Sequence, residues 1–136
     1  MSNYRNLKVW QRTIEFITTV YDLTKSFPAH ELYGLTSQIR RAATSIALNI
    51  TEGATSGYDA EFKRFLSLAI RSANEVATGF EIAKRLRYCS EEQANKQIRE
   101  ADEIAAMLQG LIKSLKKISE SAEIYSTNEP EAITND

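Results

Sequence analysis

Residues 33–53 read YGLTSQIRRAATSIALNITEG. The apolar residues that recur here at steps of three and four are Leu35, Ile39, Ala42, Ile46 and Ile50. On a helix, residues with this spacing share one face. The stretch therefore predicts a helix with one buried apolar stripe, and such a stripe needs other helices to cover it.

One flank of this apolar stripe is polar and carries Gln38, Ser45, Asn49 and Glu52. On a helix these side chains fall beside the apolar face, so we expect them to be half-buried in any bundle that the helix joins. Half-buried polar groups need hydrogen-bond partners. The partners could lie within the bundle, across a subunit boundary or on a ligand, which makes the four residues candidates for a structural or assembly network.

The composition is that of a single soluble domain, with 136 residues, 43% of them hydrophobic and 26% charged. No apolar run approaches the roughly 18 residues needed to cross a bilayer. The first ten residues, MSNYRNLKVW, lack the apolar segment of a signal peptide. A single cysteine, Cys89, cannot form an internal disulfide. These features predict a cytoplasmic protein without membrane contact.

Three further helical segments accompany the central one, which is the second of four in chain order. The first should span about 7–26, because Phe27-Pro28 stops it. The second, over about 35–52, should end at a C-cap formed by Gly53. The third should begin after a cap formed by Asp59 or Ser56 and reach about residue 87.

The fourth helix should begin after Ser90, which is placed to cap it, and carries Glu92 in its first turn. Its apolar residues keep a near-heptad rhythm to about residue 118. The pattern predicts an all-α fold, an antiparallel up-down-up-down four-helix bundle over residues 1–120 with two longer C-terminal helices. A flexible acidic tail is expected over residues 121–136.

The first helix has an apolar face wider than one packing partner would cover. Its central stripe is Trp10, Ile14, Ile17 and Tyr21, and the residues that widen it are Val9, Phe16, Val20 and Leu23. We expect this helix to contact a second subunit as well as its own bundle. The alternative is that a small bundle buries more of this one helix.

The residues needed for common catalytic and metal sites are absent from the sequence. The only histidine, His30, lies in a proline-containing loop, and one cysteine with one histidine cannot complete a tetrahedral zinc site. Asn49 with Glu52 is the pair that acid–base chemistry would use, although a carboxylate in the last turn of a helix more often orders a loop. We expect no enzyme activity, no metal and no cofactor.

The candidate nucleic-acid contacts are Arg40, Arg41, Lys63, Arg64 and Arg71, because guanidinium groups bind phosphate well. The charge balance argues against strong binding. Residues 1–120 carry three more basic than acidic residues, whereas the tail carries four acids and no base, for a net charge of −1. Glu75 follows Arg71 by four residues and can neutralise it.

An ordered series of motifs runs through residues 4–118: Val9-Trp10, Phe27-Pro28, Tyr33-Gly34-Leu35, Gln38 to Arg41, Asn49 to Gly53, Glu61-Phe62, and Ser72 with Glu75. This series resembles the four-helix bundle proteins of 23S rRNA intervening sequences, a family related to the accessory variability proteins of diversity-generating retroelements. The resemblance implies a bacterial bundle that assembles into a homopentameric ring. In the retroelement proteins the ring is basic and associates with reverse transcriptase and nucleic acid, whereas residues 54–58 here are uncharged.

The sequence and the resemblance together favour a non-enzymatic homo-oligomeric scaffold or adaptor that presents a surface to a protein or RNA partner. The alternative is an RNA- or DNA-binding accessory protein that acts with a reverse transcriptase or rRNA. An enzyme with a pocket beside Asn49 and Glu52 is the third interpretation.

Overall fold

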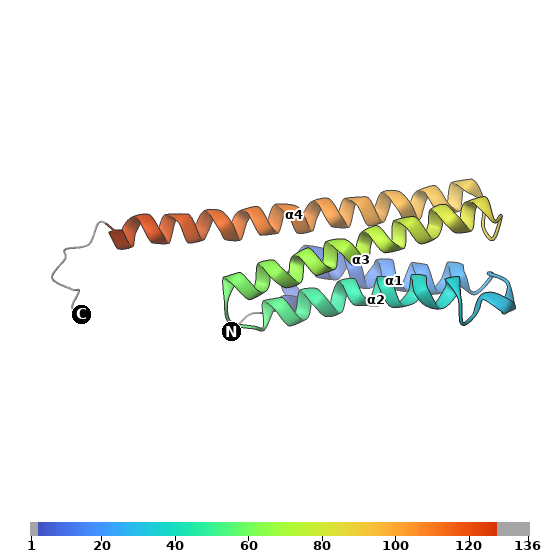
Figure 1. The fold of residues 1–136 in the computed structure, drawn as a ribbon, viewed down its shortest axis with the longest axis horizontal. Helices are drawn as coiled ribbons and strands as arrows, with labels where there is room; N and C mark the ends of the chain where they lie inside the picture. Colours follow the sequence, from blue (N-terminus) through green and yellow to red (C-terminus); the bar gives the residue numbers. More distant parts are fainter. Residues whose placement is uncertain (1–2, 128–136) are drawn as a thin grey trace.

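The computed structural model describes the backbone of residues 3–127 and the side chains of residues 3–115. Its elements are η1 (Tyr4–Asn6), α1 (Lys8–Thr24), η2 (Ala29–Glu31), α2 (Leu35–Ala54), α3 (Asp59–Arg85) and α4 (Glu91–Thr127). The part of the chain that the structure describes contains helices and turns but no strand, which confirms the predicted all-α class (Figure 1).

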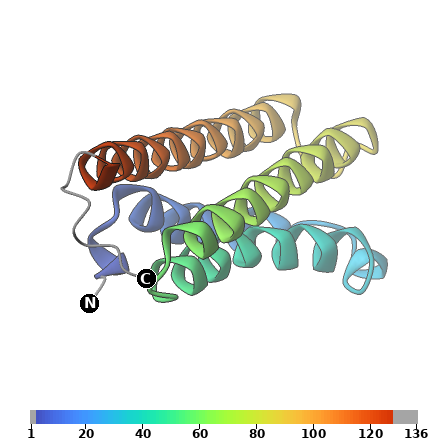
Figure 2. The same cartoon turned by 60° about the vertical axis from the view of Figure 1, so that its left-hand side comes forward.

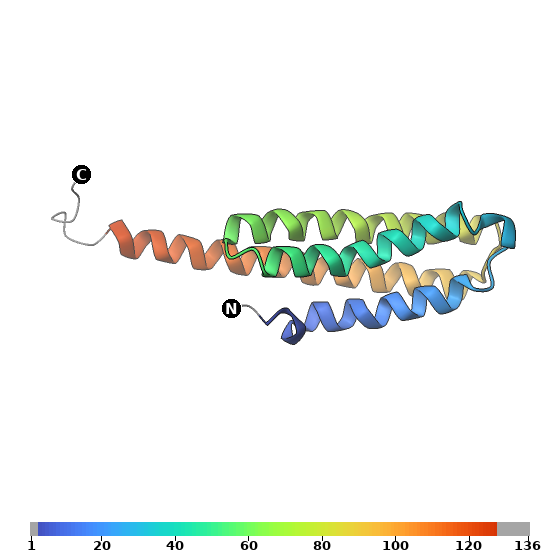
Figure 3. The same cartoon turned by 90° about the horizontal axis from the view of Figure 1, so that it is seen from below.

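Consecutive helices run in opposite directions (Figures 1 and 3). α1 packs on α2 and α4, α3 packs on the same two helices, and the backbones of the diagonal pairs do not approach closely within the described residues. α3 makes the most extensive contacts and lies between α2 and α4 (Figure 2), whereas α1 is attached more sparsely. The four helices therefore form a square bundle whose best-packed side is built on α3.

The two C-terminal helices are the longest, at 27 residues for α3 and 37 for α4. α4 continues past the ends of the other three helices (Figure 1). It reaches Thr127, beyond the boundary expected at residue 120, so the first part of the expected tail is helical. Residues 128–136 lie outside the described residues, and a flexible tail there stays a prediction.

The start of α4 confirms the cap predicted at Ser90. The Gln93 backbone N–H donates to Ser90 Oγ at 3.0 Å. The Ser90 backbone N–H donates in return to Gln93 Oε1 at 3.0 Å. This reciprocal capping box satisfies two backbone donors that a helix start would leave unpaired. The partner role of Gln93 is the part that sequence reasoning missed.

The prediction that Gly53 is a C-cap is wrong. α2 runs through this position to Ala54, and Gly53 is buried against α3. A Cβ at Gly53 would lie 2.8 Å from the Phe65 Cβ, so a side chain here would push the two helices apart. The left-handed residue in this connection is Gly57, with φ of 87°.

The cap predicted for α3 is also different in the structure. Tyr58 occupies the N-cap position without a side-chain hydrogen bond, and Asp59 is the first residue of the helix. Ser56 Oγ donates to the Gly53 carbonyl at 2.8 Å and accepts the Tyr58 N–H at 3.4 Å. Ser56 therefore orders the turn, whereas Asp59 contributes negative charge to the first turn of α3.

Small residues allow α2 and α3 to approach closely. Gly79 on α3 is covered by Ile39 of α2, whose side chain is 1% exposed. A Cβ at position 79 would lie 2.5 Å from Ile39 Cγ1. The largest fully buried side chains among the described residues are Phe80, Ile39, Ile46, Ile50, Leu66, Ile104, Leu108, Val20, Val76 and Thr13. The core is therefore filled by large residues that meet small ones across the helix interface.

Gly79→Ala should destabilise the fold by about 1–3 kcal/mol, because overpacking a filled interface outweighs the higher helix propensity of alanine. Gly110 on α4 is the matched control, since a Cβ there meets no atom within 4 Å. Gly110→Ala should leave stability unchanged or raise it by up to about 1 kcal/mol. Equilibrium unfolding in denaturant measures both, and equal effects would contradict the close-approach explanation.

Candidate functional site

Two residues of the polar flank on α2 join a network inside the bundle. Asn49 Nδ2 donates to the Ser45 carbonyl at 2.9 Å and to Ser45 Oγ at 3.0 Å. Ser72 Oγ of α3 donates to Ser45 Oγ at 3.0 Å. Ser45 and Asn49 are half-buried, as expected, and Ser72 is 5% exposed. The network links α2 to α3, and it gives Ser45 and Asn49 a structural role.

The other two flank residues are placed differently. Gln38 and Glu52 are exposed rather than half-buried. Neither side chain has a hydrogen bond or ion pair to any residue between 3 and 115. Gln38, Ser45 and Glu52 follow one another at steps of seven and therefore point in nearly the same direction from α2. What differs is the residue opposite each of them: Ser45 meets Ser72 of α3, whereas Gln38 and Glu52 meet no such partner within residues 3–115. The flank is thus divided between an internal network and an outer surface.

A groove of about 770 Å³ runs along the outer side of the α2–α3 seam. Its walls are Leu35, Gln38, Arg41 and Ser45 from α2, and Asn74, Glu75, Thr78 and Ile82 from α3. Its floor is formed by the buried residues Ile39, Ala42 and Gly79. Arg41 and Glu75 are exposed, and neither forms an ion pair within residues 3–115. The groove therefore combines a small apolar floor with unpaired charges on its walls.

Arg40 is engaged in contacts within the bundle. Its guanidinium lies 4.7 Å from the centroid of the Tyr21 ring. Its Nε donates to Thr24 Oγ1 at 2.8 Å, and its Nη2 donates to the Tyr21 carbonyl at 3.3 Å. Arg40 thus holds the end of α1 onto α2, which is a use within the bundle that sequence spacing did not reveal.

Arg64 is also engaged within the chain. It donates to the two Glu61 carboxylate oxygens at 2.9 and 3.2 Å and lies 4.4 Å from the Phe65 ring centroid. The hydrogen bond raises the pKa of Arg64 and lowers the pKa of Glu61. Of the five candidate nucleic-acid contacts, Arg41, Lys63 and Arg71 have neither an ion pair nor a side-chain hydrogen bond within residues 3–115, and the Arg71–Glu75 pair expected from the sequence is not among those formed.

The wide apolar face of α1 is mostly covered by its own bundle. Val9, Phe16 and Val20 are buried, with exposed fractions of 5%, 3% and 0%. Ile14 and Tyr21 remain exposed, at 37% and 40%. The part of this face that is free for another subunit is therefore narrower than the sequence suggested, and these two side chains define it.

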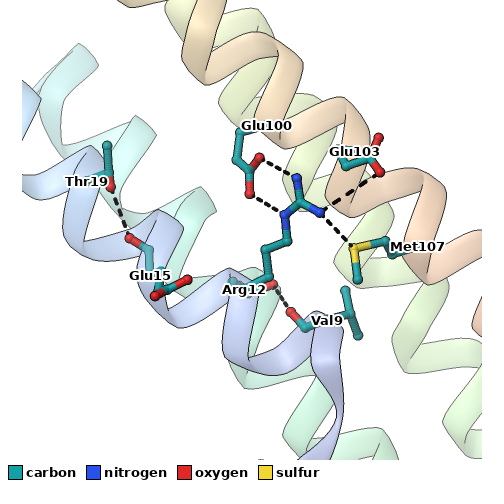
Figure 4. A network of polar contacts seen from close by, with 8 residues as sticks. Val9, Arg12, Glu15, Thr19, Glu100, Glu103 and Met107 are labelled. Carbon is teal, nitrogen blue, oxygen red and sulfur yellow. Dashed lines mark hydrogen bonds and ion pairs between the residues drawn. The ribbon is translucent and has the colours of Figure 1, made fainter.

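Polar contacts hold α1 against α4 (Figure 4). Arg12 donates to both carboxylate oxygens of Glu100, at 2.7 and 2.9 Å, and to Met107 Sδ at 3.8 Å. Its Nη1 also lies 4.0 Å from Glu103 Oε1. The hydrogen bond from Arg12 to Glu100 is the main cause of the raised pKa of Arg12. This bidentate geometry fixes the orientation of α1 relative to α4, which α1 approaches less closely than it approaches α2.

Glu31 ties the loop before α2 to the connection between α3 and α4. Its carboxylate accepts the Leu35 backbone N–H at 3.0 Å and the Tyr88 hydroxyl at 2.7 Å. The Tyr88 hydrogen bond lowers the pKa of Glu31, and the same bond raises the pKa of Tyr88. The only histidine, His30, packs edge-on against the Tyr88 ring. The loop residues are thus used to close this end of the bundle.

The described residues offer little for metal or acid–base chemistry. Among them, no three His, Cys, Asp or Glu side chains are grouped closely enough to hold a metal ion. The Asn49 amide is committed to Ser45, and burial raises the pKa of the Cys89 thiol, which disfavours the reactive thiolate. None of the described helices combines the length and apolar character required to span a membrane.

The sequence profile of the 23S rRNA-intervening sequence proteins matches residues 5–110. The chain belongs to this family. A crystal structure at 1.70 Å of a protein of unknown function from the S23 ribosomal protein family of Bacteroides thetaiotaomicron is similar to it, with a TM-score of 0.70 and 28% identity over 77% of this chain and 98% of that one. No curated protein matches the chain. The comparison supports the bundle and confirms the first part of the resemblance.

Asn49→Asp in this member of the intervening-sequence family should lower the free energy of unfolding by about 1–3 kcal/mol. The carboxylate cannot donate to Ser45, and it adds negative charge near the C-terminus of α2. Asn49→Ala loses the same hydrogen bonds without the charge and should cost less. Denaturant unfolding measures stability, and light scattering measures mass in the same samples. Unchanged stability in both variants would show that the Asn49–Ser45 bonds contribute nothing.

Proposed function

We propose that this chain is a non-enzymatic homo-oligomeric scaffold, assembled as a pentameric ring, that presents a shared surface to a protein or RNA partner. The pentamer comes from the resemblance to intervening-sequence and retroelement accessory proteins. The main support from the structure is the distribution of exposed apolar side chains. The large ones are Ile14, Tyr21, Leu32, Tyr33, Leu48, Tyr58, Ile82 and Leu86.

All of these residues belong to α1, α2, α3 and their connections, and within residues 91–115 α4 contributes none. An isolated exposed leucine is ordinary, whereas several on a small bundle are typical of an interaction surface. α2 and α3 also carry the groove with Arg41 and Glu75. This distribution favours association through α1, α2 and α3, with the described part of α4 facing outward.

Light scattering on the full chain over a wide concentration range tests the scaffold. We expect a mass several times that of the 15.3 kDa chain, and five times that mass for the ring. The mass should persist on dilution to low micromolar concentration, because a ring gives each copy two contacts. A monomer at every concentration would contradict the proposed function.

RNA binding is the second candidate function. Its support is that Arg71 is exposed, that Arg71 and Lys63 form no ion pair within residues 3–115, and that the family is named for rRNA intervening sequences. Both residues project from the part of α3 that does not face the core. Unpaired basic side chains on one helix can bind phosphate and release counterions. A reverse transcriptase or rRNA context would suit this function.

A structured RNA titrated at low and moderate salt tests this candidate. Binding should weaken as salt rises, and the variant with Lys63→Ala and Arg71→Ala should lower the log–log salt slope by roughly 2. Lys96→Ala, which removes an exposed cation of α4, is the matched control and should keep most of the slope. Absence of binding even at low salt would rule out the RNA function and leave the scaffold proposal in place.

A further inference from the structure

We propose that the groove on α2 and α3 receives the outer ridge of α1 from a second copy of this chain. The ridge consists of Gln11, Ile14, Thr18, Tyr21 and Lys25, which are all exposed and follow one another at steps of three and four. The proposal rests on the proposed scaffold function, because it identifies the two surfaces through which copies would meet.

The groove has the form that a helix needs. Ala42 and Gly79 keep its floor low, so a second helix can approach closely. It follows α2 from Leu35 to Ser45, a length of about 15 Å at the helical rise. Ile82 adds an apolar wall and is 44% exposed. A single isolated chain leaves the Ile82 side chain in water.

The ridge on α1 matches these dimensions. Ile14 and Tyr21 are its apolar side chains, seven residues apart, which is about 10 Å along a helix. Both would therefore fit within the length of the groove. The Tyr21 ring is already held in place by the Arg40 guanidinium, so docking it costs little further side-chain entropy.

The charges of the two surfaces are complementary. The groove carries Arg41 on the α2 wall and Glu75 on the α3 wall. The ridge ends at Lys25 and is flanked by the exposed acids Glu15 and Asp22. The intrachain pair of Lys25 with Asp22 is long, at 3.8 Å, with both side chains at least three-quarters exposed, so it offers little competition. Each charged wall of the groove thus has an opposite charge available on the ridge.

A chain cannot fill its own groove, because α1 does not contact α3 and lies across the bundle from it. The occupant therefore has to come from a second copy. The two surfaces differ, so the contact is head to tail, and each copy offers one ridge and one groove. The ridge is beside α2 and the groove is between α2 and α3, on neighbouring faces of the square bundle. Contacts through neighbouring faces rotate each copy relative to the previous one, and this rotation favours a closed ring of few copies over a straight filament.

Cysteine cross-linking of the full chain tests the pairing. Cys89→Ala removes the native thiol, and Thr18→Cys with Thr78→Cys then places one thiol on the ridge and one on the groove wall, both at exposed positions. Mild oxidation should give a ladder of covalent oligomers that ends at the closed ring. Each single-cysteine chain should give little covalent product. Thr18→Cys with Lys96→Cys, on the outer face of α4, is the matched control and should give no ladder.

A second measurement does not depend on disulfide geometry. Arg41→Glu should raise the chain concentration needed for assembly, measured by light scattering, at least tenfold. Lys96→Glu should leave that concentration unchanged. An oligomer that survives Arg41→Glu and gives no ladder would overturn this inference while the scaffold proposal stands. Covalent dimers from the Thr78→Cys chain alone would overturn it as well, because they indicate a two-fold contact of groove with groove. A wild-type chain that is monomeric throughout would overturn the scaffold proposal itself.

Discussion

The rest of this structure depends on the close approach of α2 to α3. Gly53 and Gly79 permit it, since a side chain at either position would collide with Phe65 or Ile39. The Ser45–Ser72 hydrogen bond needs the same short separation between the two helices. Because α2 and α3 lie so close, their outer edges rise on either side of a floor of small residues. The groove is therefore a direct result of the packing that makes the core.

The attachment of α1 follows different physics. α1 approaches its neighbours less closely than α2 approaches α3, and specific polar contacts fix its position along the bundle: Trp10 to Thr51 at one end, Arg40 to Thr24 at the other, and Arg12 to Glu100 on the α4 side. Hydrogen bonds of this kind contribute modest free energy but strong orientation. They hold α1 at a rotation that leaves Ile14 and Tyr21 outside the core. The same contacts thus determine which apolar side chains are free for a partner.

The apolar spacing was enough to predict four helices and their order, because a 3.6-residue period states directly which face is buried. The Ser90 cap was likewise readable, since its role is local. Gly53 was misassigned because a glycine near a helix end fits both a left-handed C-cap and a close helix crossing, and only the position of Phe65 decides between them. Arg40 looks like a free cation in the sequence, because its partner Thr24 lies on another helix. The Glu61–Arg64 pair, in contrast, has the i,i+3 spacing of a helical ion pair and was predictable from the sequence.

The division of the polar flank on α2 shows why the candidate surface was harder to predict than the fold. Gln38 and Ser45 are seven residues apart and point in nearly the same direction from α2, so the helical period does not distinguish their roles. The opposite helix distinguishes them: Ser72 of α3 lies within hydrogen-bond distance of Ser45, whereas the Gln38 side chain bonds no residue between 3 and 115. Arg41 lies one turn before Ser45 on the same side of α2 and forms part of the groove wall. Charged walls contribute orientation and partner choice more than affinity, whereas the exposed apolar side chains Ile14, Tyr21 and Ile82 would supply most of the binding free energy when a second copy covers them. The packing of the core therefore determines both parts of the docking surface.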